Sequence, residues 1–250
     1  MFELKNKAIF LADAHENEQR DGFLRFLLAL KEAKIECEQL ILMGDIFDLL
    51  VGEISATHHF AKPYIELLEG LSTRIEIIYL EGNHDFNLSK FFKQVKVIPI
   101  QKQPLNLQCK QRLKFTERSL NLEYKTTEFF NLQALKLSHG DIFLKFFLGL
   151  ALRSLRGHFL LSVLNLLDRL TKNSLSNKIK KNQTKKNLFY KINNFDDLAR
   201  QRFKRYDVKN GLVIEGHYHQ NFILNEDEIK YINLPSFAYK ESFFVVECCQ

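Results

Sequence analysis

Five apolar segments of the chain each end in a short group of residues of the types that bind metal ions. The groups are Asp13-Ala14-His15, Gly44-Asp45-Ile46-Phe47-Asp48, Gly82-Asn83-His84-Asp85, His139-Gly140-Asp141 and Gly216-His217-Tyr218-His219. Carboxylate oxygen, amide oxygen and neutral imidazole suit hard and borderline divalent cations, and the groups contain no thiolate. Gly, Asp and Asn are also common turn residues, which explains one such group but not five. The pattern predicts a hydrolytic site that uses Mn²⁺, Fe or Zn²⁺.

In two of these groups, potential metal ligands stand at alternate positions of the chain. His217 and His219 are two positions apart, as are Asp13 and His15. On an extended backbone alternate residues face the same way, so each pair can offer two ligands to one centre. Asp45 lies between the two pairs in the chain and is the candidate bridge between two ions.

Strand-like runs lead into every group. They cover residues 8–12, 39–43, 75–80, 132–138 and 211–215. Helical periodicity between the first three runs predicts parallel strand–helix–strand units, which place ligands at the carboxyl ends of the strands. The helices are expected at 22–33 and 61–71. Further short strand-like runs, at 95–137 and 222–246, are expected to complete a two-sheet sandwich covered by helices.

Length and composition are those of a globular protein. The 250 residues, 46% of them apolar, suffice for one sizeable domain with or without a lid. The four cysteines have no paired spacing, so neither a disulfide framework nor a zinc ribbon is predicted and a reducing compartment is expected. Residues 1–7 lack the apolar stretch of a signal peptide. We therefore expect a cytoplasmic protein that stays in the cytosol or on the cytosolic face of a membrane.

Residues 142–209 differ from the remainder in charge. They carry 16 Lys and Arg against 4 Asp and Glu, a net +12, whereas the rest carries 20 against 26, a net −6. Residues 142–170 are rich in Leu, Phe, Val and Ala, but Lys145, Arg153, Arg156 and His158 interrupt them too often for a membrane span of about 20 apolar residues. We expect an amphipathic helical lid, a basic tract at 172–191 and a third helix at 195–206.

The order and strand context of the five groups resemble those of the calcineurin-like metallophosphoesterases, over roughly residues 7–247. The resemblance implies an α/β protein with a four-layer α/β/β/α sandwich. The core is then formed by residues 1–141 and 210–250, and residues 142–209 form a helical lid insertion.

The same resemblance implies two divalent ions, with Mn²⁺ as the first expectation. The ligands of one ion would be Asp13, His15, Asp45 and His219, and the ligands of the other would be Asp45, Asn83, His139 and His217. Asn83, His84 and Asp85 would act on the phosphate: Asn83 would hold its oxygens, and His84, oriented by Asp85, would protonate the leaving oxygen or stabilise the equatorial oxygens.

A helical insertion between the single-histidine group and the final group resembles the UDP-2,3-diacylglucosamine diphosphatases of lipid A synthesis. Asn83, Asp85 and Phe86 match the GNxDF segment of that family. His84 stands where the family usually carries Arg, and residues 142–150 are apolar where Asp and Tyr commonly follow HGD. The resemblance implies a nucleotide-linked glycolipid substrate, cleaved to UMP and 2,3-diacylglucosamine 1-phosphate.

The lid composition supports the same substrate class. Two acyl chains need an apolar groove, and a diphosphate needs cations beside the metals. The candidate substrate-binding residues are Phe146, Phe147, Leu150, Arg153, Arg156 and Lys185. Arg153 and Arg156 lie one helical turn apart, and they either reach a phosphate together or extend from a surface helix to solvent. An anionic membrane surface is a second expected partner; no nucleic acid and no obligatory protein partner are expected.

Three other functions stay open. His84 gives the general GNHD pattern, which favours a metallophosphoesterase that acts on another small phosphate ester. A basic lid also suits a nuclease, but few aromatic residues alternate with the basic tract and the apolar helix has no use with DNA or RNA. A non-catalytic scaffold would typically lose histidine ligands, and none is missing here.

Overall fold

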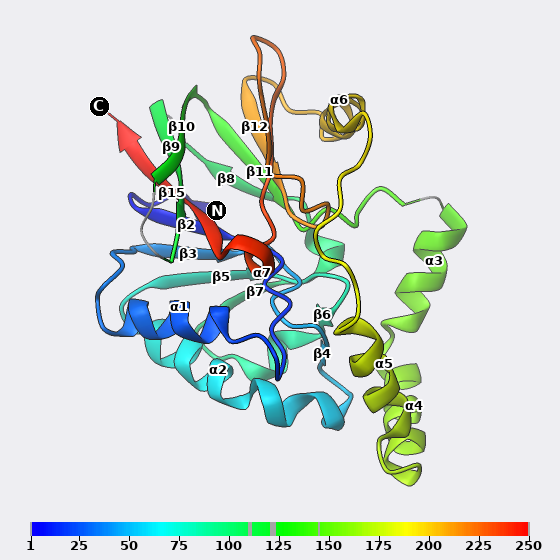
Figure 1. The fold of residues 1–250 in the computed structure, drawn as a ribbon. Helices are drawn as coiled ribbons and strands as arrows, with labels where there is room; N and C mark the ends of the chain where they lie inside the picture. The colour runs from blue at the N-terminus through cyan, green and yellow to red at the C-terminus, as the bar shows by residue number, and fades with distance from the viewer. Residues whose placement is uncertain (1, 110–111, 121–123, 145, 250) are drawn as a thin grey trace.

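The computed structural model describes residues 2–109, 112–120, 124–144 and 146–249. Two large β-sheets lie face to face between helices, and three further helices project to one side (Figure 1). One sheet has seven strands in the order β10-β9-β15-β2-β3-β5-β7, the other has six in the order β1-β8-β11-β12-β14-β13, and β4 pairs with β6.

The strands are β1 (Phe2–Glu3), β2 (Ala8–Leu11), β3 (Gln39–Leu42), β4 (Leu50–Val51), β5 (Glu76–Leu80), β6 (Asp85–Phe86), β7 (Lys96–Ile98), β8 (Leu105–Gln108), β9 (Arg112–Ser119), β10 (Tyr124–Asn131), β11 (Ala134–Ser138), β12 (Gly211–Glu215), β13 (Phe222–Asn225), β14 (Lys230–Asn233) and β15 (Ser242–Cys249). The α-helices are α1 (Gly22–Lys31), α2 (His58–Leu71), α3 (Phe146–Leu155), α4 (His158–Leu170), α5 (Ser174–Gln183), α6 (Phe195–Arg205) and α7 (Phe237–Lys240). Short 3₁₀ helices cover Ser55–Thr57, Leu88–Phe91 and Ile100–Lys102.

Alternation along the central strands creates the layers. In β2, Ile9 and Leu11 face α1 and α2, whereas Ala8 and Phe10 face the core between the sheets. On the outer face of the six-stranded sheet, α6 packs with Phe195, Ala199 and Phe203 against the strands. The order of layers is therefore helix, sheet, sheet, helix, which confirms the predicted four-layer α/β/β/α sandwich.

The strands that carry the site are parallel. β2, β3, β5 and β7 pair in parallel, and β11, β12 and β14 do the same in the second sheet. Parallel neighbours bring their carboxyl ends to one edge, so the five ligand groups meet at one end of the sandwich. All five strands expected from sequence are present, each within two residues of its expected bounds.

The segment between β11 and β12 differs from the expectation in two ways. The apolar stretch at 142–170 forms two helices, α3 and α4, because the chain turns at Gly157, which has an extended backbone. The helix expected as the third part of the lid is α6, and it forms the outer layer of the sandwich. The helices that leave the sandwich are α3, α4 and α5 (Figure 1).

Polar and apolar contacts hold α4 and α5 against the loop that follows β4. Leu161 of α4 packs on Val51 and Ile54. Asn165 Oδ1 accepts a hydrogen bond from the Ser55 amide at 2.9 Å, and Lys180 Nζ donates to the Ala56 carbonyl at 3.0 Å. Within the described ranges, no helix has both the length and the apolar character needed to cross a bilayer.

Candidate metal centre and active site

The predicted ligands converge where β2, β3, β5, β11 and β12 end. Ligand atoms of Asp13, His15 and His219 lie within 4.8 Å of one another, and so do those of Asp45, His139 and His217. A third group within the same limit joins His15, Asp45 and His84. Asp45 therefore stands between two clusters, where a residue shared by two ions must lie.

One cluster centres on His139. Its Nε2 lies 3.2 Å from Asn83 Oδ1, 3.3 Å from His217 Nδ1 and 3.4 Å from Asp45 Oδ2. Burial alone would raise the pKa of Asp45, but the neighbouring imidazoles of His139 and His84 hold it well below its ordinary value. An ionised carboxylate, an amide oxygen and two imidazoles around one point form a donor set for a divalent cation.

The other cluster contains a buried histidine without a hydrogen bond. His15 is 2% exposed, and neither of its ring nitrogens makes a hydrogen bond; Nδ1 lies 3.2 Å from Asp48 Oδ1 without suitable alignment. His219 Nε2 lies 3.2 Å from Asp13 Oδ1. Buried polar groups in native proteins are almost always satisfied, so the orphaned imidazole fits a metal ligand. When bound, two divalent ions in such a centre supply Lewis acidity and a nucleophile at neutral pH.

Three histidines are oriented in the same way. Nδ1 of His139 lies 2.9 Å from the Met43 carbonyl, Nδ1 of His84 lies 2.9 Å from the Asp48 carbonyl, and Nδ1 of His219 lies 2.9 Å from the Leu188 carbonyl. A carbonyl can only accept, so in each ring the proton is on Nδ1 and Nε2 faces the centre. Such partners fix both the tautomer and the ring orientation of metal-binding histidines.

The ligand loops hold unusual backbone conformations. Five ligand residues have positive φ angles between 45° and 64°, namely Asp13, His15, Asp45, His217 and His219. Side chains other than glycine rarely adopt this region, and residues held there cluster at functional sites. Glycine provides the space beside them: a Cβ on Gly82 would lie 2.3 Å from Asp45 Oδ1.

Asp85 is placed differently from the expectation. Its buried carboxylate accepts hydrogen bonds from the backbone amides of Asp45 at 2.9 Å and Ile46 at 2.6 Å, and from the Tyr79 hydroxyl at 2.6 Å. Burial, reinforced by the charge of Asp45, raises its pKa to about 7. The carboxylate thus organises the loop that carries Asp45, and the group that orients the His84 ring is the carbonyl of Asp48.

His84 lies beside both clusters. It is 7% exposed, and its Nε2 lies 3.9 Å from Asp45 Oδ2. Burial lowers the pKa of His84, the charge of Asp45 opposes that shift, and the neighbouring His15 and Lys186 reinforce it. The imidazole is therefore neutral near pH 7, and a bound phosphate anion favours protonation of Nε2.

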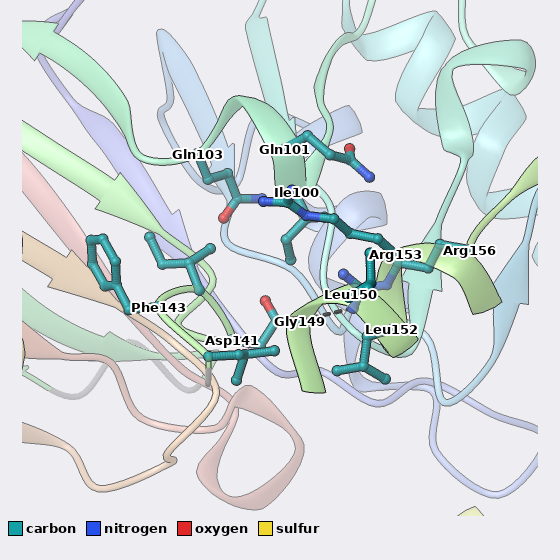
Figure 2. A pocket seen from close by; sticks show the side chains of 12 residues that line it. Ile100, Gln101, Gln103, Asp141, Phe143, Gly149, Leu150, Leu152, Arg153 and Arg156 are labelled. Carbon is teal, nitrogen blue, oxygen red and sulfur yellow. Dashed lines mark hydrogen bonds and ion pairs between the residues drawn. The ribbon is translucent and has the colours of Figure 1, made fainter. Parts of the chain in front are cut away.

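A cavity of about 390 Å³ lies next to the His139-Gly140-Asp141 loop, and none of the predicted metal ligands lines it (Figure 2). Its core side includes Gln103, whose Oε1 accepts a hydrogen bond from the His139 amide at 2.8 Å, and Asp141. Arg153 and Arg156 extend into it from the end of α3 (Figure 2). Asp141 Oδ1 is buried without a hydrogen bond, whereas Oδ2 pairs with Arg156 at 2.8 Å.

The predicted lid residues occupy different places. Leu150 lines the cavity with the two arginines, whereas the Phe147 side chain is 82% exposed on α3. Lys185 is exposed in the turn after α5. The side chain of Phe146 lies outside the described part of the structure. Arg156 does not extend to solvent, because it is buried against Asp141 and Phe86.

Some residues of the site carry no mark in sequence. Asp48 belongs to one of the predicted groups and lies beside His15. Its position three residues after Asp45 is the only feature of the sequence that could have indicated this. The Leu188 carbonyl, Lys186 and Gln103 approach from segments without a motif. A backbone carbonyl has no residue-type signature, so only the fold reveals the partner of His219.

Comparisons with known proteins agree with this geometry. The family model described as calcineurin-like phosphoesterase matches residues 7–221. A UDP-2,3-diacylglucosamine hydrolase of Shewanella loihica is 34% identical over 86 residues, which cover 34% of this chain and 35% of that protein. The protein of the same name from Photorhabdus laumondii is 30% identical over 95 residues, covering 36% and 38%. The chain thus spans little more than a third of these curated relatives.

Among solved structures, Yfce, a phosphoesterase from E. coli, aligns with a TM-score of 0.40 at 15% identity over 92% of this chain and 81% of that chain. The match of the family model extends from β2 to the last histidine ligands and includes all five ligand groups. The chain belongs to the calcineurin-like phosphoesterases.

Proposed function

We propose that the protein hydrolyses the diphosphate of UDP-2,3-diacylglucosamine and releases UMP and 2,3-diacylglucosamine 1-phosphate. The observation that carries the proposal is the cavity next to the His139-Gly140-Asp141 loop, which combines a cation with apolar side chains of α3. A substrate with a diphosphate next to hydrocarbon chains needs both. The curated relatives named for this substrate support the choice within the family.

Arg153 is the cation available to the substrate. Among the described residues, no carboxylate forms an ion pair with its guanidinium, whereas Arg156 is already neutralised by Asp141. We assign Arg153 to a phosphate group and Arg156 to the wall of the cavity. The unpaired Oδ1 of Asp141 offers an acceptor for a hydroxyl or amide hydrogen of the sugar.

The acyl chains would begin in the cavity and continue along α3. A volume of about 390 Å³ is at the small end of ligand sites, so two long chains exceed it. Leu150 lines the cavity and is still 55% exposed, and Phe147 lies on the exposed surface of the same helix. These side chains provide the apolar path beyond the cavity.

The side chains around the centre have distinct roles in the proposed reaction. Asn83 positions a phosphoryl oxygen, and the Nε2 atom of His84 faces the phosphate. Water adds to the phosphorus nearer uridine, the bond from that phosphorus to the bridging oxygen breaks, and the bridging oxygen leaves with the sugar phosphate. A proton on His84 Nε2 neutralises the charge that develops on that oxygen, as a positioned general acid does.

We propose Mn²⁺ as the resident metal, with Fe or Zn²⁺ as alternatives, because the donor set is nitrogen and oxygen without thiolate. Metal-free protein should regain activity on addition of Mn²⁺. Metal analysis of the purified protein, together with reconstitution by each ion, tests this assignment.

The proposed membrane partner is supported by α4. Phe159, Leu166 and Leu170 are 85%, 58% and 72% exposed, on one side of a helix that belongs to a segment with net charge +12. Exposed apolar side chains beside cations are typical of helices that dock on anionic lipid surfaces. Docking there would bring the site to a lipid substrate at the cytoplasmic face of the inner membrane.

A second candidate is hydrolysis of another small phosphodiester, favoured by His84 in place of the arginine usual in the glycolipid diphosphatases. The deciding measurement is kcat/KM for UDP-2,3-diacylglucosamine, for its deacylated analogue and for a chromogenic diester. We expect the acylated substrate to exceed the deacylated one by orders of magnitude, since each buried CH₂ contributes about 0.8 kcal/mol. Equal kcat/KM values for the acylated and deacylated substrates would instead support hydrolysis of a small phosphodiester.

Two variants link the measurement to the cavity. Leu150→Asn should lower kcat/KM for the acylated substrate alone. Arg153→Met should lower it for both uridine diphosphate substrates. Leu170→Asn is the matched control, because Leu170 is exposed on α4 and does not line the cavity. With substrate dispersed as monomers, this control should match the wild type.

A further inference from the structure

A segment without helix or strand crosses the last metal-ligand loop. Residues 187–192, here called the strap, connect α5 with α6. The Leu188 carbonyl lies 2.9 Å from Nδ1 of His219, the Tyr190 carbonyl accepts from Gln220 Nε2 at 3.0 Å, and the Ile192 amide donates to Gln220 Oε1 at 2.9 Å. Every second residue of the strap thus faces the loop, as in an extended strand.

Gln220 holds the strap from the core side. The residue is 3% exposed, and both ends of its side-chain amide are used by the strap. Its backbone is fixed in turn: its amide donates to Asn233 Oδ1 at 2.8 Å, and its carbonyl accepts from Lys191 Nζ at 2.8 Å. Gln220 therefore connects the six-stranded sheet to the strap, through the loop that carries His219. The strap in turn continues from the end of α5.

An aromatic pair holds the strap from the other side. Phe189 stacks on Tyr239 of α7 with ring centroids 4.0 Å apart and an interplanar angle of 11°. Both side chains are almost half exposed, at 45% and 49%. The neighbouring Ala238 amide donates to the Asp13 carbonyl at 3.2 Å, so α7 contacts the same ligand cluster as the strap.

His219 differs from the other oriented histidines in the origin of its partner. His139 and His84 face carbonyls of Met43 and Asp48, which follow β3 in the sandwich. His219 faces Leu188, which belongs to the segment between β11 and β12. The tautomer that presents Nε2 beside Asp13 therefore depends on the position of the strap.

We infer that the strap couples the inserted segment to one of the two metal subsites. Gln220 is the positioning residue that docks the strap, and the Leu188 carbonyl holds His219 ready to bind a cation with Asp13 and His15. By linkage, displacement of the strap weakens the binding of that cation, and binding of the cation strengthens the docking of the strap by the same factor. The inference rests on membership of the phosphoesterase family and is independent of the substrate proposed above.

Calorimetric titration of metal-free protein with Mn²⁺ tests the coupling without substrate. In Gln220→Leu we expect one site to weaken by about 10–100-fold, the usual effect of losing a partner that orients a ligand, while the other keeps its affinity. At intermediate Mn²⁺ the electron paramagnetic resonance spectrum should then change from that of a coupled pair to that of a single ion. Gln133→Leu, at an exposed position, is the matched control.

Two milder variants decide the matter if Gln220→Leu does not fold. Phe189→Ala and Tyr239→Ala each remove one partner of the exposed stack, and each should weaken the same Mn²⁺ site by about threefold. Their double variant should be no worse than either alone, because both act through one contact.

Hydrogen exchange provides the reciprocal measurement. In wild-type protein the Ile192 amide should exchange more slowly with Mn²⁺ than without it, and this difference should vanish in Gln220→Leu or in Phe189→Ala. Equal weakening of both Mn²⁺ sites, or an Ile192 amide whose exchange ignores Mn²⁺, would overturn the inference.

Discussion

The carbonyl oxygen of Asp48 lies 2.9 Å from Nδ1 of His84, and the same residue's Oδ1 lies 3.2 Å from Nδ1 of His15. One loop residue therefore contacts two histidines of the centre, one through its backbone and one through its side chain. The two rings are in edge-to-face contact, with centroids 5.1 Å apart.

His84 is predicted to act on the phosphate and not to bind a metal. His84→Ala should lower kcat by about 10²–10⁴-fold, the usual effect of losing a positioned acid or base, while both metals stay bound. Metal analysis beside steady-state kinetics checks the prediction. His59→Ala, at an exposed position on α2, is the control. Loss of one metal from the His84 variant would instead make His84 a ligand, as its place in a cluster with His15 and Asp45 allows.

Asp45 is predicted to bridge the two ions. Asp45→Asn removes the negative charge shared by both clusters, so activity should vanish and the metal content of purified protein should fall. Asp227→Asn, at an exposed site, should change neither. Near-normal activity with full metal loading in the Asp45 variant is the contrary outcome.

Asp85 is predicted to act on the fold of the Asp45 loop. In Asp85→Asn an amide NH₂ group would replace one of the oxygens that now accept from the Asp45 and Ile46 amides. A buried donor left unsatisfied costs about 1–3 kcal/mol, so urea denaturation of the metal-free protein should show a lower free energy of unfolding. Unchanged stability with lost activity would return Asp85 to a role at the phosphate.

Arg202 and Glu215 should depend on each other. Glu215 is fully buried, and Arg202 Nε approaches its Oε2 at 3.2 Å while another nitrogen of the same guanidinium donates to the Gly140 carbonyl at 2.8 Å. Arg202→Met leaves a buried carboxylate without its cation, which costs about 3–5 kcal/mol. Adding Glu215→Gln should recover part of that loss in denaturation experiments. A double variant no more stable than Arg202→Met would refute the pairing.

The exposed face of α4 should bind anionic vesicles. Replacement of Phe159, Leu166 and Leu170 by serine removes three large apolar side chains, so the partition coefficient onto phosphatidylglycerol vesicles should fall at least about tenfold. Co-sedimentation measures it, and Leu28→Ser on α1 is the control because Leu28 is a partly exposed leucine on a helix of the sandwich. Equal binding of all three proteins would remove α4 from the membrane contact.

The sequence predicts the central strands well because they are short apolar runs that end in turn residues, and β2, β3 and β12 are buried along their whole length. It does not predict what a helix packs against. The periodicity of α6 is the same for a lid helix as for a sandwich layer, and only the contact of Ala199 and Phe203 with the second sheet distinguishes them.

Residue types similarly revealed the metal-ligand groups but not the roles within them. A carboxylate beside a histidine reads as an orienting partner, yet Asp85 is satisfied by the backbone amides of residues brought close by the fold. The partners of His139 and His219 are main-chain carbonyls, which every residue possesses. Such contacts depend on tertiary structure and leave no pattern along the chain.

A left-handed backbone at the metal-ligand residues lowers the stability of the chain while it serves the site. The residues are Asp13, His15, Asp45, His217 and His219. Each of these residues is held in a region that costs about 1–2 kcal/mol for an L-amino acid and almost nothing for glycine. His15 is the member of this set whose buried side chain makes no hydrogen bond, so His15→Gly should raise the melting temperature of the metal-free chain while it removes a ligand. A thermostability screen run without metal would therefore select against the active site, and engineering of this protein has to score stability with the ions present.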